Sequence, residues 1–239
     1  MSLLSPSGGI VYHLRAARFR IGPWAPFRER LAGWLDEELS TAPELVLVGP
    51  NAGHCLPLAL LSRYPQLTAL EPEWLAARLL RLRLPKVEVV ARDLLVGPLL
   101  DGSAGLDDYL AEKPRAAVLF CNVLGQLQFG LGDAQQARLE TEFRRRVLPA
   151  LAGRPWASFH DRWSFDLGHD RARPLELAFE RKPSDLELGQ AWFGSEGAPL
   201  SALDHGTSEL FPPELPRHYF GWQLTPSAFH LVEAVASRA

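Results

Sequence analysis

The sequence predicts an α/β fold in which helices cover both faces of a mostly parallel β-sheet. Short, nearly all-apolar runs recur along the chain, as expected of strands that are buried on both faces. Between them lie segments whose apolar residues are three or four positions apart, which is the spacing of amphipathic helices. This alternation favours parallel strands joined by right-handed helical crossovers.

Each element follows in chain order. The first helix is expected at about 24–39, because Trp24, Phe27 and Leu31 begin an apolar face that continues to Leu39. The expected strands are 44–48, 67–70, 87–91, 115–121 and 156–159, followed by a terminal hairpin of 219–224 and 229–235. The further expected helices are 54–64, one that begins at Glu71 and Pro72, 106–112, and a long one that Asp133 can cap.

The strand–helix rhythm ends at Asp161. The stretch 162–217 is rich in charged residues, proline and glycine, which favours an insert or cap at about 165–215. We therefore expect a helical extension at 1–40 and one α/β domain at 41–239 that contains the insert. Residues 12–15 and Arg18 of the extension would either cover a ligand site or only pack on the surface.

Composition limits the classes of function. The chain has 239 residues, 47% of them hydrophobic, and a net charge of -3. This apolar content supports one large core and excludes disorder as the main state. The basic surplus typical of a nucleic-acid-binding protein is missing, so a small molecule or a protein is the expected partner.

Cys55 and Cys121 are expected to be buried thiols, with a redox switch as the alternative. No apolar run reaches the ~20 residues of a membrane span, and we expect a cytoplasmic protein.

The first predicted strand ends in the turn Gly49-Pro50-Asn51-Ala52-Gly53. In an open α/β sheet, ligands bind beyond the carboxyl ends of the strands, so this turn is a candidate ligand site. The dinucleotide fingerprint G-x-G-x-x-G would need glycine where Asn51 and His54 stand, and the Gly-Lys-Ser/Thr ending of a phosphate loop is missing. An oxidoreductase that uses NAD is therefore disfavoured.

Acidic residues follow the next two predicted strands. Glu71 stands 22 residues after Gly49, where a carboxylate can accept hydrogen bonds from both hydroxyls of a ribose. Asp93 can hydrogen-bond to the amino group of an adenine. Both residues have a structural alternative as helix caps or as partners of a helix dipole. Glu71 and the glycine-containing turn together favour a ligand that carries a ribose.

These segments resemble, in order, the motifs of the class I S-adenosylmethionine-dependent methyltransferases. The matching segments are 46–53, 69–72, 91–94 and 119–125. The resemblance covers about residues 42–160 together with the terminal hairpin. It implies a Rossmann-like sheet of seven strands in the order 3-2-1-4-5-7-6, with the last strand antiparallel. It also implies S-adenosylmethionine as cofactor and methyl transfer to a small-molecule or protein acceptor.

The resemblance further implies which residues contact the cofactor. They are Gly49, Pro50, Asn51, Ala52, Gly53, Glu71, Pro72, Asp93, Leu94 and Asn122. Residues 49–53 would line the methionine and ribose, and Glu71 would hold the ribose hydroxyls. Asp93 and Leu94 would flank the adenine, and Asn122 would face the sulfonium end.

Two positions depart from the first motif of this family. Leu47 stands where the family usually has an acidic residue, and Asn51 replaces the middle glycine. The acid normally helps to position the methionyl end of the cofactor. The alternative function is therefore a catalytically degenerate protein that binds the cofactor or serves as a scaffold.

Methyl transfer depends mainly on alignment, with optional removal of a proton from the acceptor. His160 and Asp161, just past the predicted fifth strand, are the expected catalytic residues, and they begin a histidine- and aspartate-rich stretch that ends at Arg171. This stretch, with Asp204 and His205, has metal binding and a hydrogen-bonded structural loop as alternatives. Because its spacing matches no standard zinc pattern, no metal is predicted.

Overall fold

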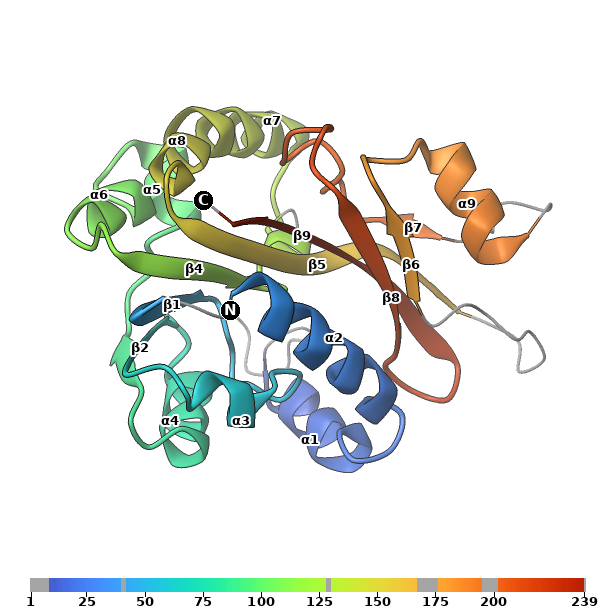
Figure 1. The fold of residues 1–239 in the computed structure, drawn as a ribbon, viewed down its shortest axis with the longest axis horizontal. Coiled ribbons are helices and arrows are strands. Elements are labelled where there is room, and N and C mark those ends of the chain that lie inside the picture. The colour runs from blue at the N-terminus through green and yellow to red at the C-terminus, as the bar shows by residue number, and fades with distance from the viewer. Residues whose placement is uncertain (1–8, 40–41, 128–129, 167–175, 195–201, 239) are drawn as a thin grey trace.

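The computed structural model describes residues 9–39, 42–127, 130–166, 176–194 and 202–238. In this part of the chain nine strands form one sheet in the order β3-β2-β1-β4-β5-β9-β8-β6, and β7 pairs with β5 beside this path (Figure 1). The strands are β1 (Glu44–Val48), β2 (Gln66–Leu70), β3 (Glu88–Val90), β4 (Ala116–Cys121), β5 (Pro155–Asp166), β6 (Glu176–Phe179), β7 (Leu203–Asp204), β8 (Arg217–Gln223) and β9 (Ala228–Arg238).

The predicted order of the central strands is confirmed. Strands β3, β2, β1, β4 and β5 are parallel, β9 is antiparallel to β5, and β8 is antiparallel to β9. The predicted number of seven strands is wrong, because β6 and β7 add two more. Both lie in the stretch without apolar periodicity, and β7 has only two residues, so their sequence gave no strand signal.

Helices cover both faces of the sheet, as predicted (Figure 1). Helices α1 to α4 lie on one face and α5 to α8 on the other, while α9 lies beside β6 and β7. None of the described helices is long and apolar enough to cross a membrane. The helices are α1 (Ile10–Phe19), α2 (Ala25–Glu38), α3 (Leu58–Leu61), α4 (Trp74–Arg83), α5 (Val96–Asp101), α6 (Leu106–Ala111), α7 (Asp133–Glu142), α8 (Leu148–Leu151) and α9 (Asp185–Phe193), with a 3₁₀ turn η1 (Leu124–Gln126) and a π-helical turn η2 (Phe143–Val147).

The first two helices are fixed to the C-terminal hairpin. The ring of Phe27 in α2 stacks on Trp222 of β8, with centroids 4.8 Å apart. Trp24 is fully buried and donates a hydrogen bond from Nε1 to the carbonyl oxygen of Leu224 at 3.1 Å. Burial of aromatic rings of this size contributes several kcal/mol, on the order of 25 cal/mol per Å² of apolar surface. The N-terminal segment therefore packs on the end of the sheet that carries β8.

Two elements differ most in length from their prediction. The helix expected at 54–64 is only α3 (Leu58–Leu61), because residues 54–56 form bends and Pro57 is the N-cap. The fifth strand, expected at 156–159, continues to Asp166 because β9 pairs with it along its whole length. His160 and Asp161 consequently lie inside β5 and not in a loop behind it.

Strand β5 contains a β-bulge at Arg162. Asp161 pairs with Val232 of β9, and the next pair is Trp163 with Leu231, so Arg162 has no partner in the register. Successive side chains of a strand point to opposite faces, and an extra residue inverts this alternation for everything that follows. Asp161 and Ser164 therefore share one face of the sheet, whereas without the bulge they would lie on opposite faces.

Candidate functional site

The turn after β1 has the conformation of a glycine-rich turn. Gly49 and Asn51 have φ angles of 62° and 53°, in the left-handed region that favours glycine. Asparagine adopts this region more readily than most residues, and the Oδ1 of Asn51 accepts a hydrogen bond from the amide of Ala52 at 2.6 Å. Asn51 therefore adopts the backbone conformation that the family's middle glycine allows.

The backbone amides of this turn already have partners within the chain. Asn51 N donates to Glu71 Oε2 at 2.7 Å, Ala52 N to the side chain of Asn51, and Gly53 N to the carbonyl oxygen of Pro50 at 3.0 Å. Phosphate-binding turns present several unpaired amides to the anion. The geometry therefore disfavours a phosphate in this turn, in agreement with the absence of both phosphate-binding motifs from the sequence.

Glu71 follows β2 and lies against the same turn. Its side chain is buried, and each carboxylate oxygen accepts one backbone amide, from Asn51 at 2.7 Å and from Glu73 at 3.0 Å. Burial raises the pKa of Glu71 to about 7, although the two amide hydrogen bonds lower it in part. A carboxylate has about four acceptor positions, so two remain for hydroxyl groups of a ligand.

The other residues predicted after β2 and β3 have different surroundings. Pro72 is exposed, and Leu94 is buried in the core beside α5. Asp93 accepts hydrogen bonds from the amides of Leu95, Val96 and Gly97 at 2.8 to 3.0 Å, so it caps the start of α5. The cap predicted as its structural alternative is present, and a contact of Asp93 with adenine stays a prediction.

Asn122 connects the end of β4 to β5. Its backbone has a φ of 57°, and its side chain forms two hydrogen bonds with Asp161: Oδ1 accepts from the amide at 2.8 Å and Nδ2 donates to Oδ2 at 3.1 Å. The neighbouring Val123 lies against Gly49, where a Cβ added to the glycine would be 2.6 Å from the valine Cβ. The turn after β1 and the carboxylate of Asp161 are thus joined through two consecutive residues.

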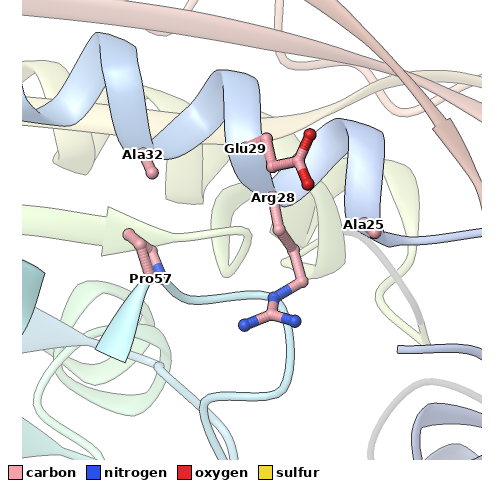
Figure 2. Close-up of a pocket in the computed structure, with 5 residues that line it drawn as sticks. All are labelled: Ala25, Arg28, Glu29, Ala32 and Pro57. Atoms are coloured by element: carbon pink, nitrogen blue, oxygen red, sulfur yellow. The ribbon is translucent and has the colours of Figure 1, made fainter. Parts of the chain in front are cut away.

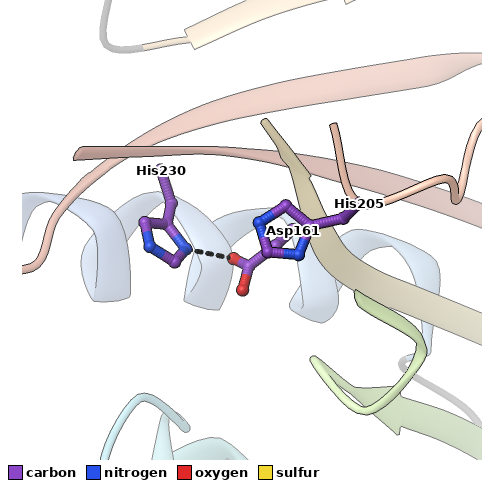
Figure 3. A group of neighbouring side chains, drawn as sticks. All are labelled: Asp161, His205 and His230. Carbon is purple, nitrogen blue, oxygen red and sulfur yellow. Dashed lines mark ion pairs between the residues drawn. The ribbon is translucent and has the colours of Figure 1, made fainter. Parts of the chain in front are cut away.

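Asp161 lies in a cluster with two histidines, His205 and His230 (Figure 3). Its carboxylate is fully buried, and burial by itself would raise the pKa. Interactions with His230, then with His205, and the hydrogen bond from Asn122 outweigh burial and hold the pKa of Asp161 below its usual value. Asp161 is therefore an ionised carboxylate at neutral pH.

His230 is not among the residues predicted from the sequence, and His205 is predicted there only as part of a loose polar group. His230 comes from β9, opposite Ser164 in the register, and His205 follows β7. The three residues are separated by 44 and 25 positions along the chain, so no local spacing indicates that they meet. Only the sheet register and the bulge at Arg162 bring them together.

His160, the other predicted catalytic residue, points away from this cluster. It is fully buried on the opposite face of β5, where its ring stacks on Phe211 and its Nδ1 is 2.9 Å from Ser158 Oγ. Its Nε2 lies 3.6 Å from the carboxylate of Glu233. These contacts favour a structural role for His160 and do not place it beside Asp161.

Replacing His160 with asparagine should therefore cost stability. We expect the free energy of unfolding to fall by about 1–3 kcal/mol, because a buried hydrogen-bonded ring and its stacking contact are lost. Urea unfolding measures the change, with the partly exposed His218 replaced in the same way as the control. An equal loss in both variants would contradict the structural role.

The N-terminal helix lies beside the turn. His13 Nδ1 of α1 is 3.3 Å from His54 Nε2, and Arg83 of α4 is 3.1 Å from His54 Nδ1 and donates to the carbonyl oxygen of Ala52. Burial, followed by the charge of Arg83, lowers the pKa of His54 to about 3. At neutral pH His54 is therefore uncharged, and α1 contacts the segment that follows the turn through Tyr12 and His13.

A hollow of about 280 Å³ lies between α2 and the segment before α3 (Figure 2). Arg28 points from α2 toward that segment. The lining residues are Ala25, Arg28, Glu29, Ala32 and Pro57, none of which is a predicted site residue. The predicted site residues lie elsewhere, after the carboxyl ends of β1, β2, β3 and β4 and inside β5.

Comparisons with known proteins give matches among solved structures. No family model and no curated protein matches the chain. The N-methyltransferase NodS from Bradyrhizobium japonicum is 14% identical, with 96% of this chain and 97% of that chain covered and a TM-score of 0.48. The amino pentose methyltransferase CalS10 from Micromonospora echinaspora is 22% identical, with 62% and 55% covered and a TM-score of 0.39, so the chain spans about half the length of CalS10.

The strand order carries the assignment of the fold. Five parallel strands in the order 3-2-1-4-5 are followed by an antiparallel last strand, which lies between the fifth strand and the other strand of the terminal hairpin. The turn after β1 and the carboxylate after β2 lie at the carboxyl edge of this sheet. The chain therefore has the fold of the class I S-adenosylmethionine-dependent methyltransferases.

Proposed function

We propose that the chain transfers a methyl group from S-adenosylmethionine to a small-molecule or protein acceptor. The observation that carries this proposal is the buried carboxylate of Glu71, which lies against the turn after β1 and keeps two acceptor positions. Ligands of open α/β sheets bind at this edge, and a carboxylate at the end of the second strand suits the two hydroxyls of a ribose.

The residues present fit this cofactor. Glu71 would hold the ribose, and residues 49–53 would line the methionine and ribose without supplying free amides, which suits a ligand that has no phosphate. Asn51 adopts the backbone conformation of the glycine that it replaces. Leu47 is fully buried in the core, so this chain lacks the usual acid near the methionyl end. Asp93 and Leu94 would flank the adenine.

The bound cofactor supplies a methyl group that is already activated on a sulfonium. The protein therefore has to align the acceptor and to exclude water. Asn122 fixes the position of Asp161 through two hydrogen bonds, and Val123 of the same segment contacts the turn. We place the acceptor at the Asp161 end of the site, and we do not assign His160 a part in the reaction.

Calorimetric titration with S-adenosylmethionine and with S-adenosylhomocysteine tests the proposal. We expect micromolar binding of both, and at least a tenfold loss in the Glu71→Ala variant, because the ribose hydroxyls lose a buried acceptor. Glu88→Ala is the matched control, since Glu88 is an exposed carboxylate of β3. If the folded chain binds neither compound, only the scaffold alternative is left.

Cofactor affinity should depend on pH through Glu71. Its pKa is about 7 in the folded chain against an ordinary value of 4.5, and only the ionised form accepts from both ribose hydroxyls. We expect the affinity for S-adenosylhomocysteine to rise between pH 6 and pH 8, with release of a proton on binding, and Glu71→Gln to remove this dependence. Calorimetry in buffers of different ionisation enthalpy measures both.

The raised pKa of Glu71 has the opposite effect on stability, because it makes the free energy of unfolding fall as the pH rises. Between pH 4.5 and about 7 the folded chain keeps a proton on Glu71 that the unfolded chain has released. The contribution of Glu71 to the free energy of unfolding should therefore be largest below pH 4.5 and fall as the pH rises to about 7. A pH series of urea unfolding curves for wild type and Glu71→Gln checks the sign.

A further inference from the structure

Three side chains that can bind a metal ion converge at the acceptor end of the site. Asp161 of β5, His205 after β7 and His230 of β9 each offer one ligand atom, and these atoms all lie within 4.8 Å of one another (Figure 3). Asp161 and His205 are buried, whereas the side chain of His230 is 18% exposed. The group is therefore enclosed by the fold and open on the side of His230.

The surroundings of His205 fix which of its nitrogens is free of hydrogen. Its Nδ1 is 2.8 Å from the carbonyl oxygen of Gly125, which can only accept a hydrogen bond, so Nδ1 carries the hydrogen. Its Nε2 is then a basic nitrogen, 3.1 Å from the hydroxyl of Ser164. Histidines that bind metals usually donate their other ring nitrogen to a carbonyl or carboxylate in this way.

The carboxylate of Asp161 accepts hydrogen bonds through one of its two oxygens only. Its Oδ2 accepts from the side-chain amides of Asn122 at 3.1 Å and Gln126 at 3.3 Å. Its Oδ1 is 2.8 Å from His230 Nδ1, yet the pair lacks the orientation of a hydrogen bond, and neither atom has a hydrogen-bond partner among the described residues. Oδ1 therefore has His230 as an ion-pair partner but no hydrogen bond, and a cation bound between the two atoms would satisfy both of them.

We propose that Asp161, His205 and His230 form a binding site for a divalent cation of the zinc type. The ligand atoms are Asp161 Oδ1, His205 Nε2 and His230 Nδ1. Neighbouring ligands of a tetrahedral ion with bonds of about 2.1 Å lie about 3.4 Å apart. This value falls between the 2.8 Å that separates Oδ1 and Nδ1 and the 4.8 Å within which all three ligand atoms lie. Two imidazole nitrogens and one carboxylate suit Zn²⁺, whereas Mg²⁺ and Ca²⁺ prefer oxygen ligands alone.

The proposed site has an open coordination position. Three protein ligands are the usual number in zinc sites that also bind water or a substrate, because the fourth position is left to that molecule. A hydroxyl or carboxylate oxygen of the acceptor is the chemical group that would occupy it. This last step depends on the proposed methyl transfer, but binding of the ion does not.

Metal titration of the full chain, without cofactor, tests the site. The chain is freed of metal with a chelator and titrated with Zn²⁺ by calorimetry, and with Co²⁺ by visible absorption. We expect one equivalent of either ion, no heat from Mg²⁺, and at least a tenfold weaker affinity in both His205→Ala and His230→Gln. His218→Ala should bind as the wild type does, because His218 lies outside the cluster.

Thermal unfolding separates loss of the site from loss of the fold. Zn²⁺ should raise the melting temperature of the wild type and of His218→Ala, and not that of His230→Gln, because only ligands that bind the folded state stabilise it. His230→Gln is suited to this test, since its side chain is partly exposed. The proposal is overturned if the folded wild type binds no Zn²⁺ or if binding survives both histidine substitutions. The proposal is also overturned if His13→Ala abolishes Zn²⁺ binding, because the ion would then be bound by His13 and His54.

These outcomes are distinct from failure of the proposed function. If the chain binds Zn²⁺ and no S-adenosylhomocysteine, the proposed metal site stands and the proposed methyl transfer is wrong. A chain that binds S-adenosylhomocysteine and no Zn²⁺ would keep the cofactor site, and Asp161 and His230 would be an ion pair without metal.

Discussion

Replacing Glu233 with alanine is expected to destabilise the folded chain by about 3–5 kcal/mol, because it leaves a buried charge without its partner. Arg217 and Glu233 are 0% and 1% exposed, and Arg217 Nε donates to Glu233 Oε1 at 3.1 Å. Tyr219 donates its hydroxyl to Glu233 Oε2 at 2.8 Å. Alanine at 233 removes both acceptors and leaves the charged guanidinium of Arg217 buried without a carboxylate partner.

Urea unfolding of Glu233→Ala measures this loss. Tyr219→Phe removes only one neutral donor and should cost about 1 kcal/mol. Glu176→Ala is the matched control, because that carboxylate lies on the adjacent β6 and is 45% exposed, and its loss should cost less than about 1 kcal/mol. The double variant Arg217→Met/Glu233→Met should regain most of the stability, since no unpaired charge is left. A small loss in Glu233→Ala would show that water reaches Arg217.

Replacing Gly49 with alanine is expected to damage both the fold and the cofactor site. A φ of 62° costs a residue with a Cβ about 1–2 kcal/mol. The new Cβ would also be 2.6 Å from the Cβ of Val123, and such overpacking costs about 1–3 kcal/mol. We expect both penalties in urea unfolding, together with at least a tenfold weaker binding of S-adenosylhomocysteine.

Two further variants separate these contributions. Gly49→Ala/Val123→Gly removes the Cβ and the methyl groups that the new Cβ would meet, and it should recover part of the stability, while the conformational cost at position 49 persists. Gly33→Ala is the control, because Gly33 lies inside α2 with open space around it, and alanine should stabilise that helix by about 0.5–1 kcal/mol. Equal effects of Gly49→Ala and Gly33→Ala would contradict the close packing of the turn.

The sequence was sufficient for the central sheet, because buried parallel strands leave a local signal. The apolar run at 44–48 becomes β1, the run at 115–121 becomes β4, and the terminal hairpin forms β8 and β9. Strands that form at an edge leave a weaker signal. β6 and β7 pair over four and two residues and depend on neighbours supplied by the rest of the sheet.

Residues of the candidate site could be predicted from the sequence only where they lie in a single turn or at the end of a single strand. Gly49, Asn51 and Glu71 lie at such ends, and the structure brings them together. The cluster of Asp161, His205 and His230 is different, because it depends on how β5 and β9 are aligned. His230 is an unremarkable residue of an alternating strand until the register places it opposite Ser164.

The extra residue at Arg162 also affects how this chain has to be compared with others. A relative whose fifth strand lacks that residue would match this one up to Asp161, and from there on a gapless alignment would equate positions on one face of the sheet with positions on the other. Trp163 and Phe165 would then be compared with positions on the face of Asp161, and Ser164 with a position on the opposite face. A single gap at position 162 restores the correspondence, so conservation of the ligand set can be judged only after that gap is introduced.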